Sequence, residues 1–174
     1  MSDKLGKTIV ITGNGKGKTT AAIGLMTKFT DMGKKVYFGQ FMKGDEYSEI
    51  IALRQEYPQI TIDQYSGRLI LGREADEMDI AVAQAGLERA SQALFSNKYD
   101  IVVLDEINVA AFLQLIPTAA ISDLIAQKPE GMTLILTGRY ATEEAIATAD
   151  HAYDIEEIKH YFYQGINARK GIEM

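Results

Sequence analysis

The chain has 174 residues, 47% of them hydrophobic and 24% charged, a composition that is typical of a soluble globular protein and excludes a disordered chain. Its 18 basic and 24 acidic side chains give a formal net charge of −6, which argues against broad, sequence-independent nucleic-acid binding. Cysteine is absent and no apolar run has the length of a signal peptide or a membrane span, so we expect one cytoplasmic domain, residues 1–174, without a membrane partner.

Short apolar runs rich in β-branched residues alternate with helix-like stretches along the whole chain. This alternation predicts an α/β fold in which helices cover both faces of a parallel sheet. In such a sheet, the loops at the carboxyl ends of the strands build the binding site. We expect strands at residues 8–12, 36–42, 60–65, 101–105, 133–137 and 153–158, and helices at residues 18–31, 48–57, 78–95, 118–127 and 142–148.

The first predicted strand leads directly into the glycine-rich stretch Gly13-Asn14-Gly15-Lys16-Gly17-Lys18-Thr19-Thr20. Its alternating glycines let several backbone N–H groups converge on an anion at the positive end of the following helix. Lys18 can place its ammonium among phosphate oxygens, and the Thr19 hydroxyl can reach a Mg²⁺ ion that bridges them. The loop is one residue shorter than GxxxxGK[ST], so we expect the nucleotide to lie differently from its usual pose. The alternative is a glycine-rich turn without a ligand.

The second and third predicted strands also lead into polar residues. Gln40 and Lys43 come at the end of the second strand, although a polar loop after a strand is ordinary. Arg73 opens the stretch Arg73-Glu74-Ala75-Asp76 before a long predicted helix, where acidic residues suit the helix dipole whatever the function. Both segments are therefore weaker candidates than the glycine-rich loop.

The fourth predicted strand ends in two carboxylates, Asp105 and Glu106. Near a phosphate loop, a carboxylate in this place can bind Mg²⁺ directly or through water, and the second can act as a further ligand or as a base. Taken alone, the pattern also fits an acidic helix cap. The glycine-rich loop upstream favours the magnesium interpretation.

Arg139 follows the fifth predicted strand. A guanidinium in that place can form a bidentate pair with phosphate oxygens and stabilise charge in the transition state, whereas the alternative is a surface arginine. The two histidines, His151 and His160, lack metal-ligand spacing, and no Ser-His-Asp or Cys-His arrangement can be assembled. Catalysis by a protein nucleophile is therefore not expected.

Six segments resemble, in order, the ATP:corrinoid adenosyltransferases of the P-loop type: TGNGKGKTTAA, QFMKG, READ, VVLDEIN, LTGR and KHYFYQGINARKGIE. The resemblance covers nearly the whole chain, and the shortened phosphate loop is itself a mark of the family. It implies a RecA-like P-loop three-layer sandwich with a mainly parallel six-stranded sheet, and a homodimer. It also implies transfer of the 5'-deoxyadenosyl group of ATP to the cobalt(I) of a corrinoid, with release of triphosphate.

The resemblance also assigns roles to residues. Residues 14–20 would bind the triphosphate, Thr19 and Glu106 would ligate Mg²⁺ with Asp105 in support, and Arg139 would contact phosphate. Cobalt(I) is already a strong nucleophile, so no general base is needed. The expected catalytic residues, Lys18, Glu106 and Arg139, would position the substrates and neutralise the charge on the departing triphosphate. A flavoprotein is a possible source of the electron that reduces the corrinoid.

On the corrinoid side, the family carries a phenylalanine and a tryptophan that displace the lower cobalt ligand. This chain has no tryptophan, and the corresponding segment, residues 67–72, contains Arg68, Leu69 and Ile70. Together with Arg73, which follows the segment, these residues are the candidates for the corrinoid side. We expect Leu69 and Ile70 to supply apolar bulk there. Two other functions stay open: a P-loop NTPase or phosphotransferase, which the short loop disfavours, and a non-catalytic ATP-binding relative with an altered corrinoid site.

Overall fold

The computed structural model describes residues 6–43, 47–65, 74–159 and 165. Strands and helices alternate along these residues. They are β1 (Thr8–Thr12), α1 (Lys18–Asp31), β2 (Val36–Phe41), α2 (Ser48–Glu56), β3 (Thr61–Tyr65), α3 (Glu77–Phe95), β4 (Ile101–Asp105), α4 (Ile107–Phe112), α5 (Ala119–Gln127), β5 (Thr133–Thr137), α6 (Glu143–Thr148) and β6 (His151–Asp154).

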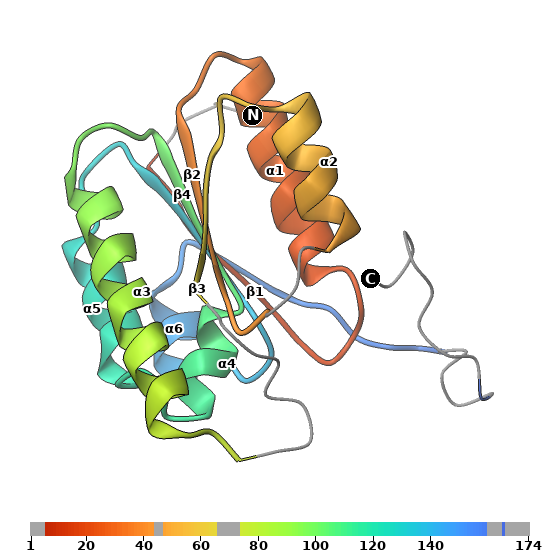
Figure 1. Cartoon of the computed structure of the whole chain (residues 1–174), viewed down its shortest axis with the longest axis vertical. Coiled ribbons are helices and arrows are strands. Elements are labelled where there is room, and N and C mark those ends of the chain that lie inside the picture. Colours follow the sequence, from red (N-terminus) through yellow and green to blue (C-terminus); the bar gives the residue numbers. More distant parts are fainter. Residues whose placement is uncertain (1–5, 44–46, 66–73, 160–164, 166–174) are drawn as a thin grey trace.

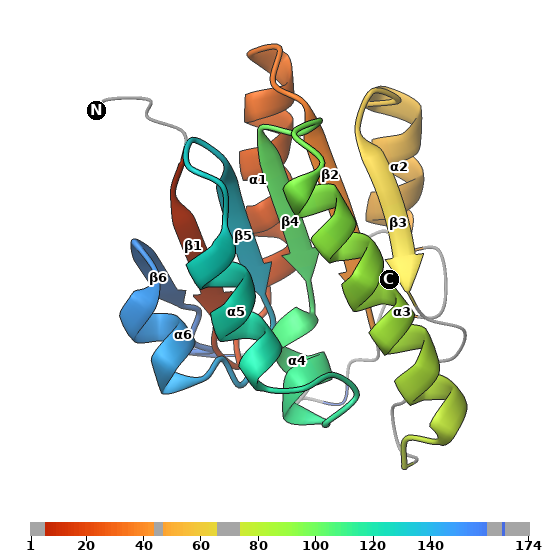
Figure 2. The ribbon, with the colours of Figure 1, turned by 90° about the vertical axis from the view of Figure 1, so that its left-hand side faces the viewer.

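The six strands form one sheet in the order β3-β2-β4-β5-β1-β6, and every neighbouring pair is parallel. Helices α1 and α2 cover one face, and α3, α4, α5 and α6 lie on the other (Figure 1). Figure 2 shows the strands side by side and pointing the same way, so that their carboxyl ends share one edge. The predicted α/β three-layer sandwich with a six-stranded parallel sheet is confirmed.

Two hydrophobic cores, one on each face of the sheet, hold the layers together. Met26, Phe38 and Val103 are fully buried between the sheet and α1 and α2. Phe41 and Leu104 belong to the larger core under α3, α4 and α5. Successive side chains of a strand point to opposite faces, so a strand that is buried on both sides must be apolar nearly throughout. The apolar runs in the sequence have this origin.

Asp150 joins the start of β6 to the start of β1. Its carboxylate accepts hydrogen bonds from the Thr8 backbone N–H at 2.8 Å and from the Lys7 ammonium at 2.7 Å. The hydrogen bond from Lys7 and that from the Thr8 amide hold the pKa of Asp150 below its usual range. This contact lies directly before the first pair of the β1–β6 register, Ile9 with His151.

Two elements differ by more than one residue from the sequence-based expectation. β6 was expected at residues 153–158 but spans His151–Asp154, because the apolar residues that suggested the strand are displaced from the positions that pair with β1. Helix α4 was not expected, since its six residues follow β4 after one residue and read as a continuation of an apolar strand. Among the described residues, no helix is long and apolar enough to cross a membrane.

Candidate functional site

Four neighbouring strands carry a polar side chain at their last or second-to-last residue, and these side chains lie in one row across the sheet. We call these residues, Gln64, Gln40, Asp105 and Thr137, the polar row. Gln40 pairs with Gln64 on one side and with Asp105 on the other, and Thr137 follows Leu136, the last residue of β5 that pairs with β4. Because side chains alternate along each strand, all four face α1, as Val103 does.

Asp105 is the centre of the polar row, and its side chain is fully buried. One carboxylate oxygen accepts from the Thr137 hydroxyl at 2.6 Å and from the Thr19 hydroxyl at 2.9 Å, and the other accepts from the Gln40 amide at 2.9 Å. Gln40 is held in turn by the Gln64 amide, which donates to its Oε1 at 2.9 Å. A buried carboxylate is tolerated only when it is paired and hydrogen-bonded, and the polar row meets that requirement.

Lys43 brings a positive charge to the same place. Its Nζ lies 3.6 Å from Asp105 Oδ2 and 3.5 Å from Glu49 Oε1, and it donates to Thr19 Oγ1 at 3.3 Å. Burial by itself would lower the pKa of Lys43, but the carboxylates of Asp105, Glu49 and Glu106 outweigh burial and raise it. The side chain therefore stays an ammonium.

The phosphate loop passes directly from β1 into α1. Gly17 is the N-cap of α1, with φ 115, and Lys18 is the first helical residue. The Lys18 ammonium donates to the carbonyl oxygens of Gly13 at 2.7 Å and Gly15 at 2.6 Å, so it lies inside the loop. Burial, and then the charge of Arg139, lower the pKa of Lys18. A bound anion would relieve both effects.

The three glycines of this loop are required for three different reasons. Gly17 has a left-handed backbone and open space around it, so only its φ demands glycine. Gly15 has no positive φ, but a Cβ there would lie 2.6 Å from the Ile155 carbonyl oxygen. Gly13 combines a φ of 99 with a Cβ position 2.1 Å from Asp154 Oδ1. The chain that continues from β6 therefore packs against the phosphate loop.

Backbone hydrogen bonds fix that packing. The Ile155 N–H donates to the Thr12 carbonyl at 2.9 Å, and the Ile155 carbonyl accepts from the Gly15 N–H at 2.6 Å. One N–H of the loop is thus used to hold its shape and is not available to a phosphate. The loop geometry depends on a residue far away in the sequence.

The loop after β5 also reaches the phosphate loop. Arg139 donates from Nη2 to the Asn14 carbonyl at 3.3 Å, and the Ala141 N–H donates to Thr12 Oγ1 at 3.3 Å. The Arg139 side chain is exposed and charged at the mouth of the loop. The structure thus brings Arg139 and the glycine-rich stretch together.

Glu106 occupies a strained position between β4 and α4. It has φ 59, which is uncommon for a residue other than glycine, and such conformations persist mainly at functional sites. Its backbone N–H donates to Thr137 Oγ1 at 3.1 Å. Burial, and then the neighbouring charge of Asp105, raise the pKa of Glu106. A nearby cation would favour its ionised form.

The donor set fits a magnesium ion whose remaining ligands are phosphate oxygens. Within residues 6–43, 47–65, 74–159 and 165, no group of three or more His, Cys, Asp or Glu side chains could hold a metal by itself. The hydroxyl of Thr19 and the carboxylate of Asp105 are hard oxygen donors, however, and Mg²⁺ usually combines one or two protein ligands with substrate phosphates. The ammonium beside these two groups marks a point that attracts a cation.

Sequence reasoning missed Thr137, Gln64 and Glu49 as members of the site. Thr137 is the last residue of β5, and Gln64 is the second-to-last residue of β3. Only the strand order makes them neighbours of Asp105 and Gln40. Of the predicted residues, Lys16 and Thr20 are exposed on the loop and at the start of α1. The corrinoid-side candidates Arg68, Leu69, Ile70 and Arg73 lie outside the described residues.

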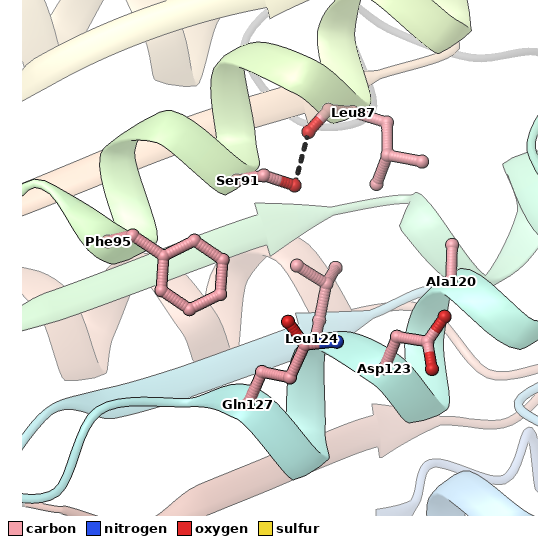
Figure 3. Close-up of a pocket in the computed structure, with 7 residues that line it drawn as sticks. All are labelled: Leu87, Ser91, Phe95, Ala120, Asp123, Leu124 and Gln127. Atoms are coloured by element: carbon pink, nitrogen blue, oxygen red, sulfur yellow. Dashed lines mark hydrogen bonds between the residues drawn. The ribbon is translucent and has the colours of Figure 1, made fainter.

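A separate groove runs between α3 and α5 (Figure 3). Leu87, Ser91 and Phe95 line it from α3, and Leu124 and Gln127 line it from α5. The polar row faces α1 on the opposite side of the sheet, so the groove is not part of the phosphate site.

The chain matches the family model "ATP:corrinoid adenosyltransferase BtuR/CobO/CobP" over residues 4–174. It is 30% identical over 171 residues to a corrinoid adenosyltransferase of Escherichia coli (strain K12), with 98% of this chain and 87% of the relative covered. It is 33% identical to a corrinoid adenosyltransferase of Pseudomonas aeruginosa, with 98% and 85% covered.

Two further proteins are similar to this chain, one in sequence and one in structure. An uncharacterised protein of Nostoc sp. is 32% identical over 94% of this chain, and the chain spans about half of that relative, 47% of its length. Among solved structures, a KaiC-like protein of Pyrococcus horikoshii OT3 superposes with a TM-score of 0.57 at 16% identity, covering 86% of this chain and 71% of that chain. The similarity to the KaiC-like protein supports the RecA-like P-loop fold alone.

Proposed function

The chain belongs to the ATP:corrinoid adenosyltransferase family, and on this premise we propose that it transfers the 5'-deoxyadenosyl group of ATP to the cobalt(I) of a corrinoid and releases triphosphate. The observation that carries the proposal is the convergence of the phosphate loop, Arg139 and the Thr19–Asp105 pair at one edge of the sheet. That edge is where open parallel sheets bind their ligands.

The proposed reaction is a substitution at the C5' carbon of ATP. The electron pair of cobalt(I) forms the Co–C bond, the C5'–O bond breaks, and the triphosphate leaves with the electrons of that bond, so that cobalt becomes formally cobalt(III). Since the corrinoid supplies the nucleophile, the protein needs to position the two substrates and to stabilise the charge on the leaving group.

The residues of the chain divide this work. The loop amides, Lys18 and Arg139 bind the triphosphate, and Lys18 must turn from the carbonyls of Gly13 and Gly15 to the phosphate oxygens. Glu106, next to the loop, supplies a carboxylate whose ionised form is favoured once positive charge gathers there. When bound, Mg²⁺ would neutralise charge on the triphosphate. The family resemblance implies Thr19 and Glu106 as its ligands with Asp105 in support; because the Thr19 hydroxyl already contacts the Asp105 carboxylate, we propose instead that Thr19 and Asp105 would hold it, with Glu106 in support.

Further parts of the proposal come from the family resemblance. We propose one domain that works as a cytoplasmic homodimer and receives its reduced corrinoid with the help of a reductant such as a flavoprotein. Arg68, Leu69, Ile70 and Arg73 are proposed to face the corrinoid. Because the chain has no tryptophan, the aliphatic side chains of Leu69 and Ile70 would have to displace the lower cobalt ligand.

The test is an assay with chemically reduced cobalamin, ATP and Mg²⁺ that follows the visible spectrum of the corrinoid and the phosphate product together. Formation of an adenosylated corrinoid with an equal amount of triphosphate supports the proposal. Release of phosphate or diphosphate with an unchanged corrinoid would instead identify an NTPase or phosphotransferase. Nucleotide binding without either product would identify a non-catalytic relative.

A further inference from the structure

Lys43 places its ammonium where a divalent cation is expected. Its Nζ lies among oxygens of Thr19 on α1, Asp105 on β4 and Glu49 on α2, at 3.3, 3.6 and 3.5 Å. These contacts are made by one side chain that is only 17% exposed. Lys43 thus already neutralises the buried carboxylate of Asp105.

We propose that Lys43 is a placeholder cation, which occupies the magnesium position in the nucleotide-free protein and withdraws when Mg²⁺ and nucleotide bind together. The proposal rests on the proposed function only in requiring that the site binds Mg²⁺ with a nucleotide. It assigns Lys43 a role in the order of binding and makes it a positioning residue.

The geometry does not allow both cations to stay. A Mg²⁺ ion lies about 2.1 Å from a ligand oxygen, and the ammonium lies 3.3 Å from the same Thr19 hydroxyl, so the two could be no more than about 5.4 Å apart. Both would also share Asp105 as counter-ion. Two cations at that separation beside one buried carboxylate repel each other strongly, because the surroundings screen them poorly. One of them must leave.

The structure offers Lys43 a place to go. Its Nζ is 3.5 Å from Glu49 Oε1 and 5.0 Å from the centroid of the Tyr47 ring, and both groups lie at the start of α2. A carboxylate and an aromatic face can keep an ammonium paired after it leaves Asp105. The residue before it, Met42, has φ 65, so the chain already bends sharply at the base of this side chain. The long flexible stem of lysine suits such a movement.

The consequence is that free divalent cations do not bind before the nucleotide. The protein alone offers Thr19 and Asp105, and Lys43 already satisfies both. Only a cation that arrives with phosphate oxygens gains enough ligands to displace the ammonium. The site would therefore bind the metal and the nucleotide as one unit.

The test replaces Lys43 by methionine, which has a similar length and no charge, and titrates the nucleotide-free protein with Mn²⁺ by electron paramagnetic resonance. We expect Lys43→Met to bind Mn²⁺ at least tenfold more tightly than the unchanged protein and to lose that gain when Thr19→Val is added. Lys35→Met removes the same charge from an exposed residue of the loop before β2 and is expected to change Mn²⁺ affinity less than twofold.

Equal Mn²⁺ affinity in Lys43→Met and the unchanged protein would overturn the proposal and leave Lys43 a fixed ion-pair partner. If Lys43→Met does not fold, as judged by circular dichroism, Lys43→Gln takes its place, because an amide can still donate to Asp105 without carrying charge. The same tenfold gain is then required. Since the measurement uses neither ATP nor a corrinoid, a protein that fails to adenosylate cobalamin can still confirm the role of Lys43, and the reverse also holds.

Discussion

The contact between Gly15 and the chain that follows β6 yields a sharp prediction for Gly15→Ala. The new Cβ would lie 2.6 Å from the Ile155 oxygen and 2.8 Å from the Glu156 carbonyl carbon, whereas ordinary contacts begin at 3.4 Å, so one segment must move by about 0.8 Å. The backbone of Gly15 itself needs no positive φ, so strain in φ does not contribute. The whole effect comes from the clash.

The magnitude follows from two losses. Overpacking of this kind typically costs about 1–3 kcal/mol, and the hydrogen bond from Gly15 N–H to the Ile155 carbonyl is worth about 1 kcal/mol. We therefore expect Gly15→Ala to lower the free energy of unfolding by about 3 kcal/mol, which corresponds to a fall in Tm of roughly 6–12 °C for a chain of this size. ATP affinity should fall with it, since the same loop binds the phosphates.

Thermal unfolding followed by circular dichroism, together with calorimetric titration of ATP, measures both effects. The matched control is Gly24→Ala in α1, where a Cβ meets nothing within 4 Å and alanine should raise stability by about 1 kcal/mol. If Gly15→Ala melts within 2 °C of the unchanged protein and binds ATP equally well, the segment after β6 does not shape the loop and the reasoning fails.

Three further predictions concern the polar row, the mouth of the loop and the base of the sheet. Thr137→Val should lower the free energy of unfolding by about 2 kcal/mol in a denaturant titration, because Asp105 and the Glu106 N–H each lose a hydrogen-bond partner. Thr137→Ser, which keeps the hydroxyl, should recover most of that stability. Equal loss in both variants would point to packing instead. Arg139→Ala should leave Tm unchanged, since the side chain is exposed, but lower kcat for adenosyl transfer by about 10²–10³; an unchanged kcat would remove Arg139 from the mechanism. Asp150→Asn should be less stable than the unchanged protein at neutral pH by under about 1 kcal/mol, because the lowered pKa of Asp150 in the folded state stabilises the fold above the usual carboxyl range. That difference should disappear as the pH falls through the lowered pKa of Asp150, and a difference that persists in acid would mean that the contact is not electrostatic.

The sequence predicted those parts of the fold whose causes are local. Apolar runs with β-branched residues located β1 to β5 to within one residue, and the loop from Gly13 to Thr20 predicted its own place between a strand and a helix. Asp105 was a candidate because it ends such a run. The boundary of β6 was wrong because it depends on pairing with β1, through contacts such as that of Asp150 with Thr8, which residues 153–158 do not reveal.

The parts that the sequence could not predict depend on which strands are neighbours. Thr137 is an ordinary threonine at the end of a strand until β5 is placed beside β4, where its hydroxyl meets the Asp105 carboxylate. Gly15 likewise looked like a residue needed for phosphate approach, and only the structure reveals that Ile155 crowds it. Glu49 became part of the site through Lys43, which turns back from the end of β2 toward α2.

The position of β1 in the sheet has a consequence for how the protein is made. Its two neighbours are β5 and β6, which come last along the chain among the strands that the structure describes, so the first strand of the nascent chain stays unpaired until residues 133–154 have been made. Apolar strands whose edges stay unpaired during synthesis are prone to aggregate, and chaperones bind such exposed segments. A translation product that stops before Ile155 would carry every residue of the phosphate loop and still lack the backbone partner that gives the loop its form.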